Sequence, residues 1–220
     1  MAKLKGNLFG SFQGKIGLTY GRMVHGVNLG ANMPVGRSKS YKPTSAELDR
    51  QIRFKTLAQL ASAFQGAAAI GLKVKAKQIG PLVSPFDAFI NINNEAVSVR
   101  GGESEVDYGS ITLSEGKMGA VAFGNASFAE PNRVSVNFTT SADEPFTDAQ
   151  DKVYVCVYQP DTNQCLLSAP VARTEGTVDM RLPVSWTGMT VHVYGFALGN
   201  GRDNMGVNSD SSYIGTGNIG

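Results

Sequence analysis

Polar and apolar residues alternate through the second half of the chain, a pattern that predicts short β-strands from residue 108 onward. Val134, Val136 and Phe138 alternate strictly with polar residues, and a second alternating run covers residues 153–158. A period of two is typical of strands with one face in a core. Clusters of Gly, Asn, Asp and Pro separate the expected strands, which lie at 110–113, 120–128, 133–139, 152–158, 164–168, 177–182, 190–198 and 212–214.

Seven or eight short strands at this spacing indicate an antiparallel β-sandwich, which we expect over residues 108–220. An immunoglobulin-like arrangement is the first expectation, and a jelly roll is the alternative. The predicted fold class is therefore mainly β.

A helical period replaces this alternation between residues 44 and 66. Thr44 and Glu47 have the spacing of a capping box, apolar residues follow at helical spacing as far as Phe64, and Gly66 is placed to end the helix. Residues 67–78 fit either a second helix or a strand, and residues 85–94 fit a short helix. We expect one or two helices in a connecting region that covers residues 44–107.

Residues 1–43 are rich in glycine and basic residues. The glycines are separated by single apolar residues, and each interior glycine would cost a helix about 1 kcal/mol relative to alanine. This segment has too few apolar residues to form much of a core. We expect an extended arm or a short hairpin that becomes ordered against another surface. A disordered terminus is the alternative, although such tails usually contain fewer apolar residues.

Charge divides the chain near residue 78. Residues 1–78 hold thirteen Lys and Arg and two acids, a net charge of +11, whereas residues 79–220 hold seven basic residues and sixteen acids, a net charge of −9. This asymmetry predicts either a polyanionic partner or contact between the basic and acidic faces of neighbouring copies. The candidate contact residues are the early cations: Lys3, Lys5, Lys15, Arg22, Arg37, Lys39, Lys42, Arg50, Arg53 and Lys55.

Nucleic acid is one candidate partner for these cations. Lysine and arginine neutralise phosphates, and Phe12, Tyr20 and Tyr41 are placed among them where aromatic rings could stack on bases. No helix-turn-helix, RRM or KH signature is present, and the charges are spread over a long segment. Contact with the acidic domain of a neighbouring copy explains both halves of the charge division and is the leading alternative.

Chemistry for catalysis is scarce in this sequence. His25 and His192 are the only histidines and neither has an evident nucleophile beside it, so a serine or cysteine hydrolase is not indicated. We expect no enzyme, no cofactor and no metal. Cys156 and Cys165 flank a turn and could meet across a hairpin, but we expect two free thiols, as in a reducing compartment.

Acidic residues gather at positions 103–107, 143–151 and 203–210, and we expect these to be solvated turns rather than calcium or glycoside-hydrolase sites. The N-terminus has no apolar signal-peptide region, and no run of about eighteen apolar residues exists. A virion or cytoplasmic location without a membrane partner is therefore expected.

Short motifs near both ends of the chain resemble a known group of proteins. They are Gly14-Lys15-Ile16-Gly17, Gly21, His25-Gly26, Arg37-Ser38, Gln51–Phe54, Leu182-Pro183, Trp186, Val193–Phe196 and Ser209–Gly215. Together they resemble an uncharacterised domain-of-unknown-function family of similar length, encoded in Bacteroidota genomes and their phages. The resemblance implies the same layout, an arm and helix before a β-sandwich, and no catalytic residues. A phage setting favours a virion component.

The leading hypothesis is a non-enzymatic structural or assembly protein of a phage particle that oligomerises through its N-terminal arm, with itself or with other virion proteins. A nucleic-acid-binding protein using the same arm is the alternative. A glycan- or surface-binding β-sandwich that uses the loops near residues 203–210 is the second alternative.

Overall fold

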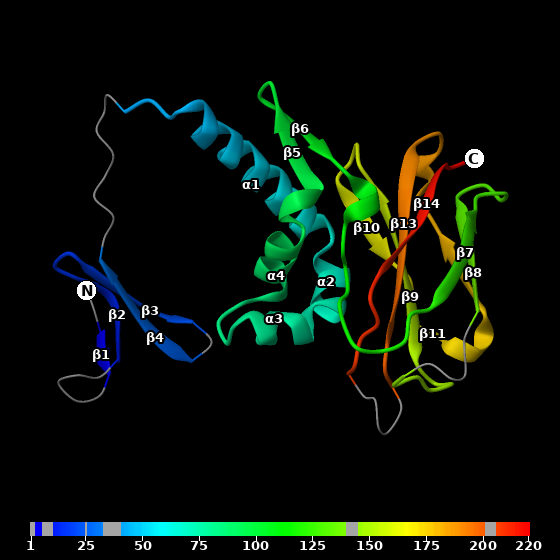
Figure 1. Ribbon diagram of the computed structural model, residues 1–220, viewed down its shortest axis with the longest axis horizontal. Helices are drawn as coiled ribbons and strands as arrows, with labels where there is room; N and C mark the ends of the chain where they lie inside the picture. The colour runs from blue at the N-terminus through cyan, green and yellow to red at the C-terminus, as the bar shows by residue number, and fades with distance from the viewer. Residues whose placement is uncertain (1–2, 6–10, 25, 33–40, 140–144, 201–205) are drawn as a thin grey trace. The chain divides into compact units, whose positions relative to one another are not determined.

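The computed structural model describes residues 3–5, 11–24, 26–32, 41–139, 145–200 and 206–220, and in this part of the chain strands predominate, as the sequence predicts (Figure 1). The chain divides into two compact units, Met1–Thr44 and Ser45–Gly220.

The first unit is a four-stranded antiparallel sheet whose strands follow one another in chain order. They are β1 (Lys3–Lys5), β2 (Ser11–Ile16), β3 (Thr19–Val24) and β4 (Val27–Asn32). Gly17 in the β2–β3 turn and Gly26 before β4 have φ angles of 59° and 83°, which side chains disfavour. The structure therefore has a four-stranded meander where the sequence predicts an arm or a short hairpin. Gly17 and Gly26 lie in turns, so they do not interrupt the strands.

The second unit begins with helices. They are α1 (Ser45–Ala63), α2 (Gln65–Gly71), α3 (Lys73–Ile79) and α4 (Pro85–Ile92), where the sequence predicts one or two. Ser84 and Asp87 cap α4 reciprocally, since the Ser84 amide donates to Asp87 Oδ2 and the Asp87 amide donates to Ser84 Oγ, both at 3.2 Å. A hairpin that the sequence did not predict follows, formed by β5 (Val97–Arg100) and β6 (Glu103–Val106).

Two antiparallel sheets complete the second unit. In the larger sheet, β9 (Lys152–Gln159) and β13 (Thr190–Leu198) are central, β14 (Ser212–Asn218) pairs with β13, and both β10 (Gln164–Leu167) and β11 (Val171–Ala172) pair with β9. In the smaller sheet, β8 (Arg133–Thr139) lies between β7 (Ala122–Ser127) and β12 (Thr177–Arg181).

Strands are present in seven of the eight predicted places, and the predicted strand at 110–113 is wrong. A 3₁₀ turn, Tyr108–Ser110, leads into that segment, where Ile111 and Leu113 are buried in the core beside the helices. Their alternation reflects this burial and not strand pairing.

The larger sheet, which we call the central sheet, is buried on both faces. Val153, Val155 and Val157 of β9 belong to a core shared with β8 of the smaller sheet. Tyr154 and Tyr158, on the other side of β9, belong to a second core shared with the helices, which cover that face (Figure 1). The helices of the expected connecting region and the strands after residue 108 therefore fold as one body.

The two cysteines form a disulfide, so the expectation of free thiols is wrong. Cys156 lies on β9 and Cys165 on β10, where the antiparallel register places Cys165 opposite Tyr158. The two Cα atoms are 6.7 Å apart, within the distance that a disulfide spans. The hairpin turn at residues 160–163 produces this proximity.

Candidate partner-binding site

The pairing of β2, β3 and β4 gathers cations and an aromatic ring on one face of the N-terminal sheet. Lys15 lies opposite Tyr20, and Arg22, two residues further along β3, lies opposite Leu29. Because side chains opposite each other share a face and successive residues alternate, Lys15, Tyr20 and Arg22 project from the same face. All three are exposed.

The opposite face of these strands carries no charge. A row of glycines, Gly14, Gly21 and Gly30, crosses it. Ile16 and Met23 lie on either side of this row, and both side chains are more than two-fifths exposed. The sheet therefore has one cationic face and one uncharged face.

The described part of this sheet has no core of its own. Among the residues of β2–β4 whose exposure the structure describes, only Gly21 is buried, and Leu18 in the β2–β3 turn is 80% exposed. Small sheets generally need an apolar face packed against another layer to be stable. The sequence of this unit contains seven Lys and Arg and no acid. This unit therefore combines exposed apolar side chains with a wholly basic set of charged residues.

The predicted contact residues fall in two places. Lys3 and Lys5 lie on β1, paired with Gln13 and Ser11 of β2, and Lys15 and Arg22 share the cationic face. Lys42 is exposed ahead of α1, whereas Arg50, Arg53 and Lys55 belong to α1 in the second unit. The predicted residues Arg37 and Lys39 lie outside the described residues.

A groove between α1 and α4 brings two of the predicted cations together. Its volume is about 460 Å³, and it is lined by Arg50, Arg53, Phe54, Leu57, Ile90 and Asn94. The four α1 residues recur at helical spacing and share one side of the helix. Lys55, on the same helix, is exposed and does not line the groove. Sequence reasoning missed Phe54, Ile90 and Asn94, because their role depends on how α4 packs.

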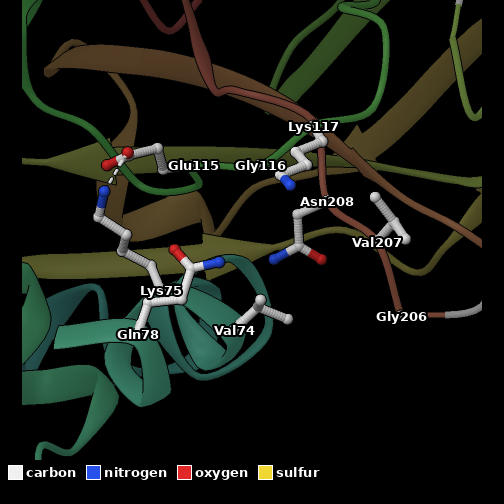
Figure 2. A pocket seen from close by; sticks show the side chains of 9 residues that line it. All are labelled: Val74, Lys75, Gln78, Glu115, Gly116, Lys117, Gly206, Val207 and Asn208. Carbon is white, nitrogen blue, oxygen red and sulfur yellow. Dashed lines mark hydrogen bonds and ion pairs between the residues drawn. The ribbon is translucent and has the colours of Figure 1, made fainter. Parts of the chain in front are cut away.

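A second cleft, of about 480 Å³, lies between α3 and two loops of the β-rich part (Figure 2). Three charged residues line it: Lys75 and Glu115 pair with each other, and Lys117 is the third. Asn208 donates through Nδ2 to the carbonyl oxygens of Ile70 and Gly71, at 3.1 and 2.6 Å. These contacts attach the loop between β13 and β14 to the helices. The polar side chains that make them therefore hold the fold together.

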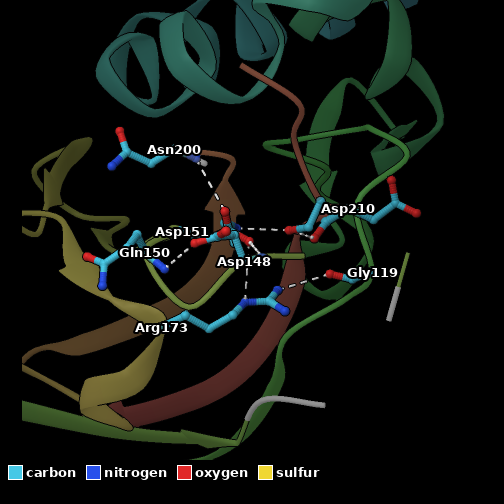
Figure 3. Close-up of polar contacts among 9 residues, drawn as sticks. Gly119, Asp148, Gln150, Asp151, Arg173, Asn200 and Asp210 are labelled. Atoms are coloured by element: carbon cyan, nitrogen blue, oxygen red, sulfur yellow. Dashed lines mark hydrogen bonds and ion pairs between the residues drawn. The ribbon is translucent and has the colours of Figure 1, made fainter. Parts of the chain in front are cut away.

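One acidic cluster contains a buried charge instead of a solvated turn (Figure 3). Asp151 is 0% exposed, and its carboxylate accepts hydrogen bonds from the Asp148 amide at 2.8 Å and the Asn200 amide at 3.3 Å. Arg173 Nε lies 3.9 Å from Asp151 Oδ2, and Arg173 Nη2 donates to the Gly119 carbonyl at 3.1 Å. The expectation of a solvated turn is wrong at Asp151, because its buried carboxylate accepts hydrogen bonds from its own loop and from the Asn200 loop and lies beside Arg173.

His192 packs against two tyrosines, whereas His25 lies outside the described residues. The His192 ring stacks on Tyr108 with centroids 4.1 Å apart, and Nδ1 is 3.0 Å from the Tyr213 hydroxyl. Partial burial disfavours the charged imidazolium and lowers the pKa of His192.

This lowered pKa predicts that stability falls on acidification. The unfolded chain takes up the proton near pH 6.5, before the folded protein does, so the free energy of unfolding should fall from about pH 7.5 to pH 5. We expect His192→Gln to flatten this dependence, measured by urea unfolding at several pH values. An unchanged slope in His192→Gln would assign the pH dependence to other groups.

No cluster of three or more metal-binding side chains occurs among the residues that the structure describes. Within the same residues, none of the helices combines the length and apolar character needed to cross a membrane.

The chain thus combines a cationic sheet with a larger β-rich unit that encloses two cores. The profile of a family of unknown function, DUF6266, matches residues 11–215, and the chain belongs to this family. The prediction that the chain belongs to an uncharacterised family is confirmed. The occurrence of that family in Bacteroidota and their phages stays a prediction. No curated protein and no solved structure matches the chain.

Proposed function

We propose that this chain is a non-enzymatic structural protein that assembles, with its own copies or with other particle proteins, through its N-terminal sheet. The observation that carries the proposal is the exposure of apolar side chains on a sheet whose described residues enclose no core. A phage virion is the setting that the sequence resemblance favours, and the same assembly could take place in the cytoplasm before packaging.

The distribution of charge favours contact between the basic N-terminal sheet of one copy and the acid-rich second unit of a neighbouring copy. All eighteen acidic residues of the chain lie in residues 45–220, and residues 1–44 have only basic ones. Two N-terminal sheets would repel each other through their cationic faces, whereas the sheet of one copy would attract the acidic unit of the next. Such head-to-tail contacts build rings or filaments.

In this proposal the β-rich part of the second unit is a rigid body that folds independently of the N-terminal sheet. Its two sheets share one core, which supports the expected sandwich, and we propose the immunoglobulin-like arrangement ahead of the jelly roll. Both cores consist entirely of residues after position 56, so the second unit should fold without the first.

Deletion of residues 1–43 tests the assembly. We expect the full chain to form multimers that dissociate as salt rises, and the shortened chain to remain monomeric with an unchanged circular-dichroism spectrum. Sedimentation velocity at matched concentrations measures both. Lys15→Glu/Arg22→Glu should weaken the multimer, whereas the control Arg100→Glu, an exposed position of β5, should not. Multimers of the shortened chain equal to those of the full chain would refute the proposal.

Nucleic-acid binding is the second candidate, favoured by Tyr20 lying on the same face as Lys15 and Arg22. It would appear as binding of a labelled single-stranded oligonucleotide whose affinity falls steeply with salt. For glycan binding, residues 203–205 of the loop named for it lie outside the described residues, and no observation on the described part favours it.

A further inference from the structure

We infer that the groove between α1 and α4 is a separate docking site, which holds an acidic peptide segment of an assembly partner by a carboxylate and an adjoining apolar side chain. This site belongs to the second unit and does not depend on the N-terminal sheet.

The groove presents two guanidinium groups on one side of α1. Arg50 and Arg53 are three residues apart, and Phe54, 59% exposed, lies beside them. Ile90 of α4 is half-buried and supplies apolar surface, whereas Leu57 of α1 lines the groove but is 1% exposed. A charged pair next to an apolar surface matches a segment in which an acidic residue neighbours a leucine or an aromatic residue.

Neither arginine has a carboxylate in the described part of this chain. The ion pairs among the described residues involve other groups, and Arg53 Nε is buried with no hydrogen-bond partner. An arginine binds a carboxylate through two parallel hydrogen bonds, and these would come from the terminal nitrogens of Arg53, because its Nε is enclosed. The enclosure also restricts the side chain before binding, so less of its conformational entropy is lost when a carboxylate binds. A carboxylate entering from outside would therefore meet a positioned donor.

The sequence and the groove narrow the choice of occupant. Residues 1–44 contain no acid, so the N-terminal unit of any copy lacks the carboxylate side chain that the groove requires. A nucleic acid is a poorer fit, because phosphate backbones bind extended basic tracks and this groove has two cations among mostly uncharged residues. An acidic peptide segment satisfies both the charges and the apolar wall.

Fluorescence anisotropy with the full-length chain tests the site, using a fluorescein-labelled peptide of alternating glutamate and leucine. We expect Arg50→Gln/Arg53→Gln to weaken binding about tenfold or more, and Arg53→Lys to weaken it as well, because lysine lacks the fork. Phe54→Ala should weaken this peptide more than a glutamate–serine peptide. The matched control is Lys55→Gln, which removes a charge from the same helix outside the groove and should leave the affinity within twofold.

Two results would overturn the inference. In the first, Lys15→Gln/Arg22→Gln abolishes peptide binding while the α1 variants do not, which would place the peptide on the N-terminal sheet. In the second, a twelve-residue oligothymidylate, and not the peptide, binds with dependence on Arg50 and Arg53, which would make the groove a phosphate site. The first result would leave the proposed assembly intact, because that rests on deletion of residues 1–43.

Discussion

Asp151→Ala is expected to lower the free energy of unfolding by about 3–5 kcal/mol, the usual cost of removing one partner from a buried ion pair. Arg173 is 3% exposed, so its charge would remain in the interior without the nearby carboxylate. The Asp148 and Asn200 amides would lose their acceptor as well. Folded domains are stable by only about 5–15 kcal/mol, so this change would be a large fraction of the total.

Urea unfolding followed by circular dichroism measures the effect, and an exposed pair provides the control. Arg133 and Glu130 form an ion pair 2.7 Å long at the surface, and Glu130→Ala should cost less than about 1 kcal/mol. The double variant Asp151→Ala/Arg173→Met should recover part of the loss, because it also removes the buried charge that faces Asp151. Equal costs for Asp151→Ala and Glu130→Ala would show that Asp151 is hydrated in solution.

Alternation predicted the strands correctly wherever one face of a strand points to a core. β8 is the clear case, since Val134, Val136 and Phe138 are buried and their neighbours are not fully buried. β9 alternates Val with Tyr or Cys in the same way, yet both of its faces are buried. Nothing in that segment alone reveals the helical layer that covers the second face, because the layer comes from a distant part of the chain.

Tertiary context explains the errors. A glycine-rich segment has weak propensity for any element, so the N-terminal meander depends on turns at Gly17 and Gly26 that are ambiguous in the sequence. An aspartate in a polar loop is typically solvated, and the burial of Asp151 follows from Arg173 arriving from another loop. Arg50 and Arg53 were among the predicted contact residues, whose role stays a prediction, and their grouping with Ile90 required the packing of α4.

These errors bear on how the protein could assemble. The cationic segment is a sheet with two distinct faces, so the orientation in which a partner meets it is restricted, as it would not be for a flexible arm. The groove on α1 gives the second unit a cationic site of its own within an otherwise acid-rich region. Under the proposed assembly, one copy would present a cationic sheet, an acid-rich unit and a groove for an acidic segment to different neighbours.

The rigidity of that groove depends on how α1 is held against the central sheet, and Phe64 is one of the buried residues that pack there, with Leu57, Leu60 and Ala61. Phe64 lies between α1 and α2, and its backbone amide donates to the Leu60 carbonyl at 2.8 Å. Its ring is fully buried and lies 4.7 Å from the Tyr158 ring, 5.5 Å from the Tyr194 ring and 5.7 Å from the Phe89 ring, measured between centroids. The side chain therefore joins two helical segments to the central sheet.

We expect Phe64→Ala to lower the free energy of unfolding by about 3–5 kcal/mol, because the surrounding rings cannot collapse fully into the cavity. Phe54→Ala is the matched control: it removes the same side chain from the same helical region where the ring is exposed, and should change stability by no more than about 0.5 kcal/mol. Urea unfolding measures both variants. A cost for Phe64→Ala no greater than that for Phe54→Ala would mean that the helices are not anchored to the sheet through this ring, and the α1–α4 groove would then lose the rigid support on which its recognition of a carboxylate depends.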